Sequence, residues 1–133
     1  MKLKDYFEET KGLSILSTAD GQGRVTTAIY SAPRVRKDNT IAFIMRERLT
    51  YQNLLANPHA AFMFVEKNAG YQGVRLFLKK MREDDDPEMS ARMTRRNLTP
   101  EEDREKGPKH LVIFRVEKIL PLIGAGESHV TIG

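Results

Sequence analysis

The chain has 133 residues, 40% hydrophobic and 30% charged, which is the composition of a single globular domain able to form its own core. It contains no cysteine, so disulfides, thiolate metal sites and cysteine nucleophiles are excluded. The net charge is +4, but acidic and basic residues alternate along the sequence and do not gather in one tail. We therefore expect no nucleic-acid partner.

The sequence also gives no sign of membrane insertion or export. No apolar run approaches the roughly 20 residues that span a bilayer. The N-terminal segment MKLKDYFEETKG is amphipathic and carries acidic residues, unlike a signal peptide or a transit peptide. We expect a cytoplasmic protein with no membrane partner.

The first part of the chain predicts a short helix followed by a β-hairpin. Residues 2–11 place Leu3 and Tyr6 on one helical face, and a glycine follows. Residues 13–19 and 25–32 are β-rich runs separated by the sequence DGQG, which is a strong hairpin-turn signal.

The middle of the chain predicts three more strands. Residues 34–39 are polar and predict a turn, so residues 41–45 are expected to form a third antiparallel strand. Residues 60–65 are apolar on both faces, which favours a central position in the sheet. In the fifth strand, residues 74–82, the alternation breaks near residues 78–80 and predicts a bulge.

Two short helices are predicted before the last strand. Asp86 and Pro87 form an N-cap followed by a proline at the first helical position. The sequence TPEE at residues 99–102 is a capping box with a proline inside it. Residues 110–123 form the sixth strand, and the whole pattern predicts a mostly β fold with short helices, a six-stranded antiparallel β-barrel in one domain spanning residues 1–133.

A candidate anion site lies between the third and fourth strands. Thr50 is placed where the N-cap of a short helix is expected, and Arg46 and Arg48 precede it. The first N–H groups of a helix have no intrahelical acceptor and attract an anion. An ordinary capped turn explains the same residues, so the pattern alone leaves both interpretations open.

Other chemistry has no matching motif. There is no glycine-rich dinucleotide loop, no Walker loop and no serine on a nucleophile elbow. The histidines are far apart without metal-ligand spacing, so we expect no metal site. No side chain stands out as catalytic, and an enzyme of this sequence would depend on a bound cofactor.

The order of these elements resembles that of the FMN-binding split barrels, the pyridoxamine 5'-phosphate oxidase-like family. The resemblance extends from about Lys4 to Leu122 and is densest over residues 12–78. It implies a split β-barrel that holds the FMN phosphate at the start of the short helix. The family often has a Ser-Arg-Lys-like triplet there, and this chain has Arg48, Leu49 and Thr50, with the hydroxyl and the charge in a different order.

The resemblance further implies flavin contacts along the second strand, at the end of the third strand, in the short helix and near the start of the fifth strand. The implied cofactor-binding residues are Thr27, Ala28, Ile29, Tyr30, Ser31, Ile44, Met45, Arg46, Arg48, Thr50, Asn53 and Gln72. In the family, the residue matched by Gln72 reaches the flavin of the partner subunit. The implied assembly is a homodimer with the FMN sites at the subunit interface.

One departure from the family bears on the reaction. True pyridoxamine phosphate oxidases carry a C-terminal Arg-x-His pair that grips the substrate, whereas His129 here has no arginine two residues before it. We therefore expect no vitamin B6 oxidation. The remaining interpretations are an FMN-dependent oxidoreductase acting on a small molecule, a non-catalytic flavin-binding or electron-transfer module, and a related barrel that binds deazaflavin or haem.

Overall fold

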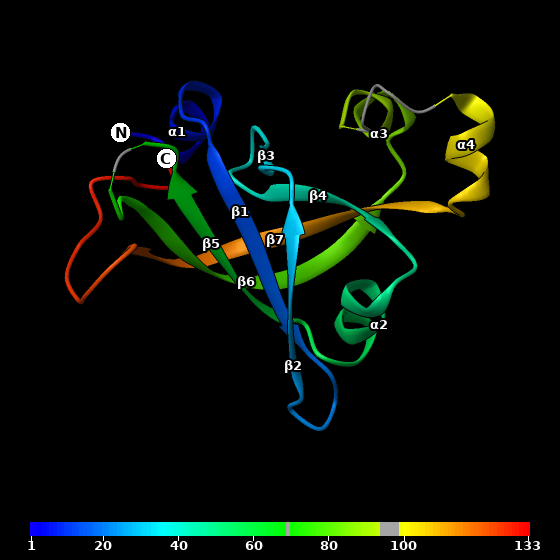
Figure 1. The fold of residues 1–133 in the computed structure, drawn as a ribbon, viewed down its shortest axis with the longest axis horizontal. Helices are drawn as coiled ribbons and strands as arrows, with labels where there is room; N and C mark the ends of the chain where they lie inside the picture. The colour runs from blue at the N-terminus through cyan, green and yellow to red at the C-terminus, as the bar shows by residue number, and fades with distance from the viewer. Residues whose placement is uncertain (69, 94–98) are drawn as a thin grey trace.

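In the part of the chain that the structure describes, seven strands form one curled antiparallel sheet, and four short helices lie around it (Figure 1). The computed structural model describes residues 1–68, 70–93 and 99–133. The elements in chain order are α1 (Leu3–Glu9), β1 (Gly12–Ala19), β2 (Val25–Tyr30), β3 (Arg34–Val35), β4 (Ile41–Arg46), α2 (Leu49–Ala56), β5 (His59–Glu66), β6 (Gly73–Asp84), α3 (Pro87–Met93), α4 (Pro100–Glu105) and β7 (Lys109–Pro121). The mostly β fold predicted from the sequence is confirmed.

The strand order in the sheet is β2-β1-β5-β6-β7-β4-β3. The hairpin of β1 and β2 is confirmed, and β5 lies inside the sheet as its apolar sequence predicts. The predicted count of six strands is wrong by one, because Arg34 and Val35 pair with the start of β4 before the chain turns. A ladder of two residues is too short to produce an alternating pattern, so the sequence showed only a turn there.

The third long strand, β4, pairs with β7 at the end of the chain and not with β2. Strands β2 and β4 face one another across the curl of the sheet, where the rings of Tyr30 and Phe43 lie 5.9 Å apart, centroid to centroid. This arrangement closes the sheet into a split barrel.

The curl of the sheet follows from irregular pairing between its two longest strands. The register of β6 against β7 shifts between Phe77 and Leu78 and again between Lys80 and Arg82. Each irregularity bends the strands and increases their twist. The bulge that the sequence predicts near residues 78–80 is therefore confirmed.

The two helices between β6 and β7 begin at their predicted signals. Asp86 accepts a hydrogen bond from the N–H of Met89 at 3.0 Å at the start of α3. At the start of α4, Thr99 accepts from the N–H of Glu102 and completes the capping box. None of the helices in the described ranges is long and apolar enough to cross a membrane.

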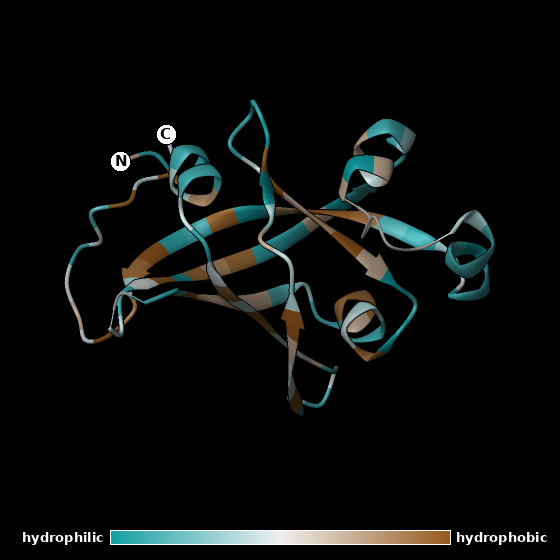
Figure 2. Cartoon of the chain, turned by 45° about the horizontal axis from the view of Figure 1, so that its top comes forward, coloured by the Kyte–Doolittle hydropathy of each residue, from teal (hydrophilic) through white to brown (hydrophobic). Residues whose placement is uncertain are grey.

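The core fills the concave side of the sheet with aromatic and branched side chains. Phe43 lies at its centre, with its ring 5.5 Å from that of Phe62 and 5.6 Å from that of Phe114. Helix α1 covers one end of this core with Leu3 and Tyr6, both buried. Figure 2 shows hydrophobic residues recurring along the strands, as expected for strands with one buried face.

Candidate cofactor-binding cleft

A cleft of about 590 Å³ opens between β2, β4, the start of α2 and the segment that leads into β7. Its described lining residues are Thr26, Ala28, Ile29, Tyr30, Ser31, Ala32, Phe43, Ile44, Arg46, Arg48, Leu49, Thr50, Met93, Lys106 and Lys109. The volume is within the range of about 300–1,000 Å³ usual for cofactor and ligand sites. One wall is apolar, and the wall at α2 and β7 is cationic.

Most of the residues that the sequence assigns to cofactor binding line this cleft together. They are Ala28, Ile29, Tyr30, Ser31, Ile44, Arg46, Arg48 and Thr50. Strand β2 supplies the first group, and the end of β4 with the start of α2 supplies the second. The two groups meet because the curl of the sheet brings β2 opposite β4.

The other four assigned residues do not line the cleft. Thr27 is exposed on the opposite face of β2 from Ala28, since side chains alternate along a strand. Met45 points into the core and is 1% exposed. Asn53 is buried and donates to the hydroxyl of Thr18 at 3.1 Å, which fastens α2 to β1.

The fourth, Gln72, lies in the turn between β5 and β6, at the opposite end of the molecule from α2 (Figure 1). Its side chain is exposed. Within one chain it cannot reach the cleft, so its expected contact with the flavin of a partner subunit stays a prediction.

The start of α2 differs from its predicted form. The cap position is Arg48, and the N–H of Gln52 donates to the Arg48 carbonyl at 3.0 Å to close the first turn. Thr50, expected as the cap, is the second residue of the helix and is buried at 5% exposure. Arg48 is extended, two residues after the end of β4, and the helix begins at Leu49 without a side-chain cap. The N–H groups of this first turn have no intrahelical acceptor.

The two arginines before α2 have different surroundings. Arg46 is almost buried; its guanidinium donates to the carbonyl of Gly107 at 2.6 Å, to the carbonyl of Asp103 at 3.1 Å and to the Asp103 carboxylate. Arg48 is exposed, and its side chain makes no hydrogen bond or ion pair within the described chain. Arg46 therefore holds α4 in place, and Arg48 is available for a ligand.

The cleft is positively charged. Arg46, Arg48, Lys106 and Lys109 line it, and none of its described lining residues is acidic. Asp103 offsets part of this charge from outside the cleft, and hydrogen bonds from Lys109 and Arg46 hold the pKa of its carboxyl below the usual value. The side chain of Lys106, like that of Arg48, has no partner among the described residues. An anion entering the cleft would meet two unpaired cations.

Tyr30 is the titratable group on the apolar wall. Burial raises its pKa, while a hydrogen bond with Thr50 and the charge of Arg48 partly offset that effect. The phenol is therefore neutral at physiological pH. The Tyr30 hydroxyl can accept or donate a hydrogen bond within the cleft, close to Arg48 and Thr50.

A second set of contacts fixes α2 on its far side. The hydroxyl of Tyr51 donates to Glu83 at 2.7 Å, and its ring stacks on His110 with centroids 4.3 Å apart. Burial and the bond to Glu83 raise the pKa of Tyr51 to about 12. Burial alone would raise the pKa of Glu83, but the hydrogen bonds from Tyr51 and His110 outweigh it and lower that pKa. These contacts keep the first turn of α2 in a constant position at the cleft.

Sequence reasoning missed the two lysines of the cleft. Lys109 is opposite Arg46 in the antiparallel pairing of β4 and β7, and Lys106 precedes it at the end of α4. These residues are about sixty positions from Arg46 in the chain, and no local pattern connects them. Only the pairing of β4 with β7 reveals that they belong to the site.

The fold and the cleft define this protein as a split barrel with a cofactor-sized, cationic cleft. The family model described as pyridoxamine 5'-phosphate oxidase matches residues 2–122. The chain therefore belongs to the pyridoxamine 5'-phosphate oxidase family, as the order of its elements predicted. A search of curated protein sequences found no match.

Solved structures share the fold. An FMN-binding protein from Syntrophomonas wolfei subsp. wolfei is 23% identical, with a TM-score of 0.70 over 92% of this chain and 85% of that one. An F420 reductase is 14% identical, with a TM-score of 0.70 over 88% and 95% of the two chains. HutZ, the haem storage protein from Vibrio cholerae, is 15% identical, with a TM-score of 0.60 over 89% and 90%. At these identities the similarity establishes the fold alone.

Proposed function

We propose that this protein binds FMN in the cleft between β2, β4 and α2 and acts as a flavin-dependent oxidoreductase on a small molecule. The observation that carries the proposal is Arg48 at the first turn of α2, whose side chain has no hydrogen-bond or ion-pair partner in the described chain, in a cleft with no described acidic lining residue. A phosphate would pair with the guanidinium and accept from the free N–H groups of the helix. Bound FMN would supply the hydride chemistry, and the protein would supply binding and a shielded cleft.

The cleft favours FMN over FAD and offers few candidate ligands for haem. It offers one cationic end, and the sequence has no glycine-rich turn for a second nucleotide half, which argues against FAD. Haem is usually held by an axial histidine, cysteine, methionine or tyrosine. Among the described lining residues there is no histidine or cysteine, the phenol of Tyr30 is engaged with Thr50, and Met93 is the remaining residue of an axial-ligand type.

A non-catalytic flavin carrier is the second candidate, and one observation favours it. No histidine, aspartate or glutamate is among the described lining residues, so the cleft has no carboxylate or imidazole for general acid–base catalysis. Tyr30, with its raised pKa, is the nearest proton donor. A carrier needs no such group, whereas an enzyme would take the proton from Tyr30, the substrate or water.

Purified protein should be yellow, and denaturation should release a compound that mass spectrometry identifies as FMN. Stopped-flow mixing with NADH or NADPH then separates the two candidates, because an oxidoreductase is reduced rapidly and a carrier reacts only with a partner protein. A colourless protein that takes up no added FMN would overturn both. Release of F420 or haem would assign the cleft to that cofactor.

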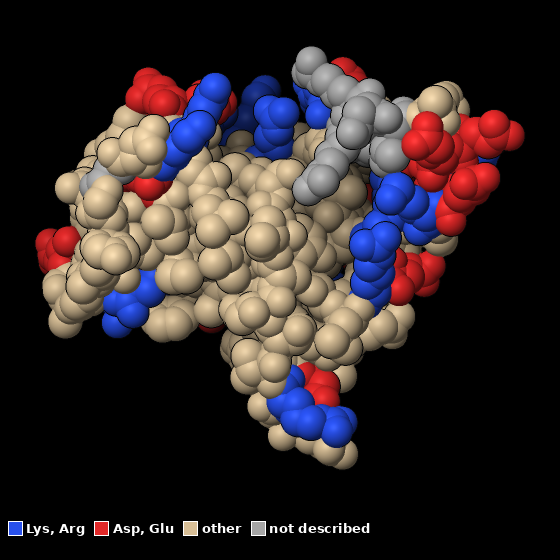
Figure 3. Space-filling view, in the orientation of Figure 1, with Lys and Arg blue, Asp and Glu red and all other residues tan. Residues whose placement is uncertain are grey.

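We further propose a homodimer formed through the convex face of the sheet. Ile15 and Met63 are neighbours in register on this face, and Ile29, which also borders the cleft, is in register with Ile15 and is 68% exposed. In Figure 3 the surface over β1 and β2 carries few charged side chains among the described residues. An exposed apolar face of this kind is typical of an interface, and symmetric dimers are the commonest oligomers. Gln72 at the end of the sheet would then be able to approach the partner's cleft.

The dimer predicts a definite result in light scattering at micromolar concentration. Wild-type protein should have twice the mass of one chain, and Phe77→Lys, which places a charge on the convex face, should shift it toward the monomer. Phe77 is 46% exposed, so the substitution leaves the core intact. Leu55→Lys, at an exposed position on α2, is the matched control and should stay dimeric. A wild-type monomer with flavin bound would contradict the proposal.

A further inference from the structure

A second and larger recess lies beside the cofactor cleft. It has a volume of about 970 Å³ and is bounded by α1, the hairpin of β3 and β4, and α3. Ala32 and Met93 line both cavities, so the recess adjoins the cleft. Figure 3 shows Lys and Arg side chains along the upper edge of the molecule, between α1 and α3. We call this recess the hairpin groove.

The floor of the hairpin groove is apolar. Phe7 enters from α1, Pro33 and Val35 from the hairpin, and Met89 and Met93 from α3. The two methionines pack against a small cluster on β4 and β7, so the wall they form is anchored to the sheet. Methionine side chains are flexible and polarisable and fit aromatic bodies of varied shape. The floor therefore suits a flat apolar ligand.

The rim of the hairpin groove carries five basic residues and two acidic ones. Both acidic residues already have partners: Glu8 pairs with Lys4 at 3.1 Å, and Asp38 accepts from the N–H and hydroxyl of Thr40. Arg36 is paired with Asp84 at 2.5 Å. The remaining three basic residues, Arg34, Lys37 and Arg92, make no side-chain hydrogen bond or ion pair within the described chain. The rim thus has a surplus of unpaired positive charge.

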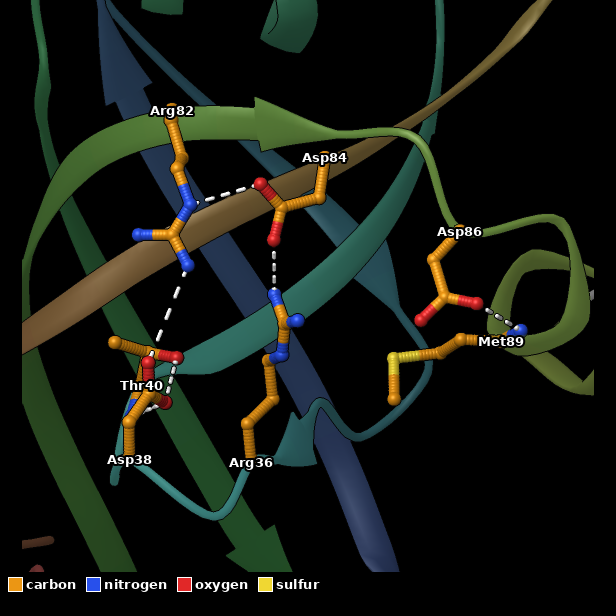
Figure 4. Close-up of polar contacts among 7 residues, drawn as sticks. All are labelled: Arg36, Asp38, Thr40, Arg82, Asp84, Asp86 and Met89. Atoms are coloured by element: carbon orange, nitrogen blue, oxygen red, sulfur yellow. Dashed lines mark hydrogen bonds and ion pairs between the residues drawn. The ribbon is translucent and has the colours of Figure 1, made fainter.

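The same ion pairs hold the walls in position. Figure 4 shows Asp84 accepting from Arg36 of the hairpin and from Arg82 of β6, at 2.5 and 2.8 Å. These two bonds keep the pKa of the Asp84 carboxyl below its usual value. Asp86, two residues on, caps α3 through the N–H of Met89. The short connection between Asp84 and Asp86 therefore ties the hairpin wall to the α3 wall.

We propose that the hairpin groove binds a small organic anion with a flat apolar body, such as an aromatic carboxylate or sulfonate. The ligand body would lie on the floor, and its charged group would pair with Arg34 and Lys37 at the rim. Charge-assisted hydrogen bonds from these cations would be strong, and burial of the apolar ligand body on the floor would add to the binding free energy. Because the groove adjoins the cleft, this anion is the substrate class of the proposed flavin protein, and that step rests on the proposed function.

The test is calorimetric titration with naphthalene sulfonate and with uncharged naphthalene methanol. The sulfonate should bind at least about tenfold more tightly, the margin of one charge-assisted bond. The double variant Arg34→Gln and Lys37→Gln should lose about that factor for the sulfonate and leave naphthalene methanol binding unchanged. Equal affinity for the two ligands, or a sulfonate affinity unchanged in the double variant, would overturn the proposal.

Two further measurements distinguish sulfonate binding in the hairpin groove from binding in the cofactor cleft. The sulfonate affinity should be the same in Arg48→Gln, which alters the cleft, and the same after saturation with FMN. A sulfonate displaced by FMN, or lost in Arg48→Gln, would show that it occupies the cleft and would refute the groove. Failure of the protein to bind FMN would refute the proposed function and leave the sulfonate result unaffected. Circular dichroism checks that each variant is folded.

Discussion

Replacing Arg48 by glutamine should weaken FMN binding by about tenfold to a hundredfold, because it removes one charge-assisted hydrogen bond worth about 1.5–3 kcal/mol. Arg48 is the arginine at the first turn of α2 with no partner in the described chain, so its loss removes a ligand contact and breaks no internal one. Titration of apo protein by quenching of flavin fluorescence measures the change. The melting temperature of the apo variant should equal that of the wild type.

Riboflavin provides the matched ligand, since it lacks the phosphate. Wild-type protein should prefer FMN to riboflavin, and Arg48→Gln should lose most of that preference by weakening FMN alone. Arg104→Gln, at an exposed arginine of α4 outside the cleft, is the control variant and should bind FMN as the wild type does. Equal affinity of the wild type for FMN and riboflavin would show that this end of the cleft is not a phosphate site.

Replacing Phe43 by alanine should lower the free energy of unfolding by about 3–5 kcal/mol, the usual cost of deleting a buried phenylalanine. Phe43 is 1% exposed and contacts the rings of Tyr30, Phe62 and Phe114. These rings belong to strands β2, β5 and β7. The substitution therefore leaves a cavity where the two sides of the split barrel meet. The surrounding strands can fill this cavity only in part, because hydrogen bonds to their neighbouring strands hold them in place.

Urea denaturation followed by circular dichroism measures the loss. Leu55→Ala, at an exposed position on α2 away from the proposed interface, is the control and should cost less than about 1 kcal/mol. Phe43→Leu should fall between the two, because it keeps most of the buried volume. Phe43 also lines the cleft, so FMN affinity should fall in parallel with stability in the alanine variant. A loss below about 1 kcal/mol for Phe43→Ala would contradict the central position of this ring.

The cofactor cleft and the hairpin groove are adjacent, and each suits a different ligand. The cleft is cationic at α2 and β7 and apolar at β2, which suits a phosphate joined to a ring system. The hairpin groove also combines an apolar surface, its floor, with basic residues, at its rim. It meets the cleft at Ala32 and Met93, which line both cavities. A cofactor in the first and an organic anion in the second would meet at those two residues.

Local sequence determined each element that a few neighbouring residues can specify. The DGQG turn set the hairpin of β1 and β2, and the capping box at Thr99 set the start of α4. The broken alternation near residues 78–80 located the bulge in β6. Two arginines and a hydroxyl around the start of α2 predicted a candidate anion site there, because helix starts and basic residues attract anions wherever they occur. All of these signals lie within a few residues of the feature they predict.

Only the tertiary structure decided which strands pair and which charges remain free. The pairing of β4 with β7 brings Lys106 and Lys109 to the cleft and Asp103 to Arg46, so that one arginine is engaged and the other, Arg48, is available. The two-residue strand β3 depends on its pairing with β4, and the hairpin groove beside it exists because α1 and α3 form its other walls. Contacts between residues far apart in the chain come from the burial of a shared core, and no single stretch of sequence specifies which distant stretch will pack against it.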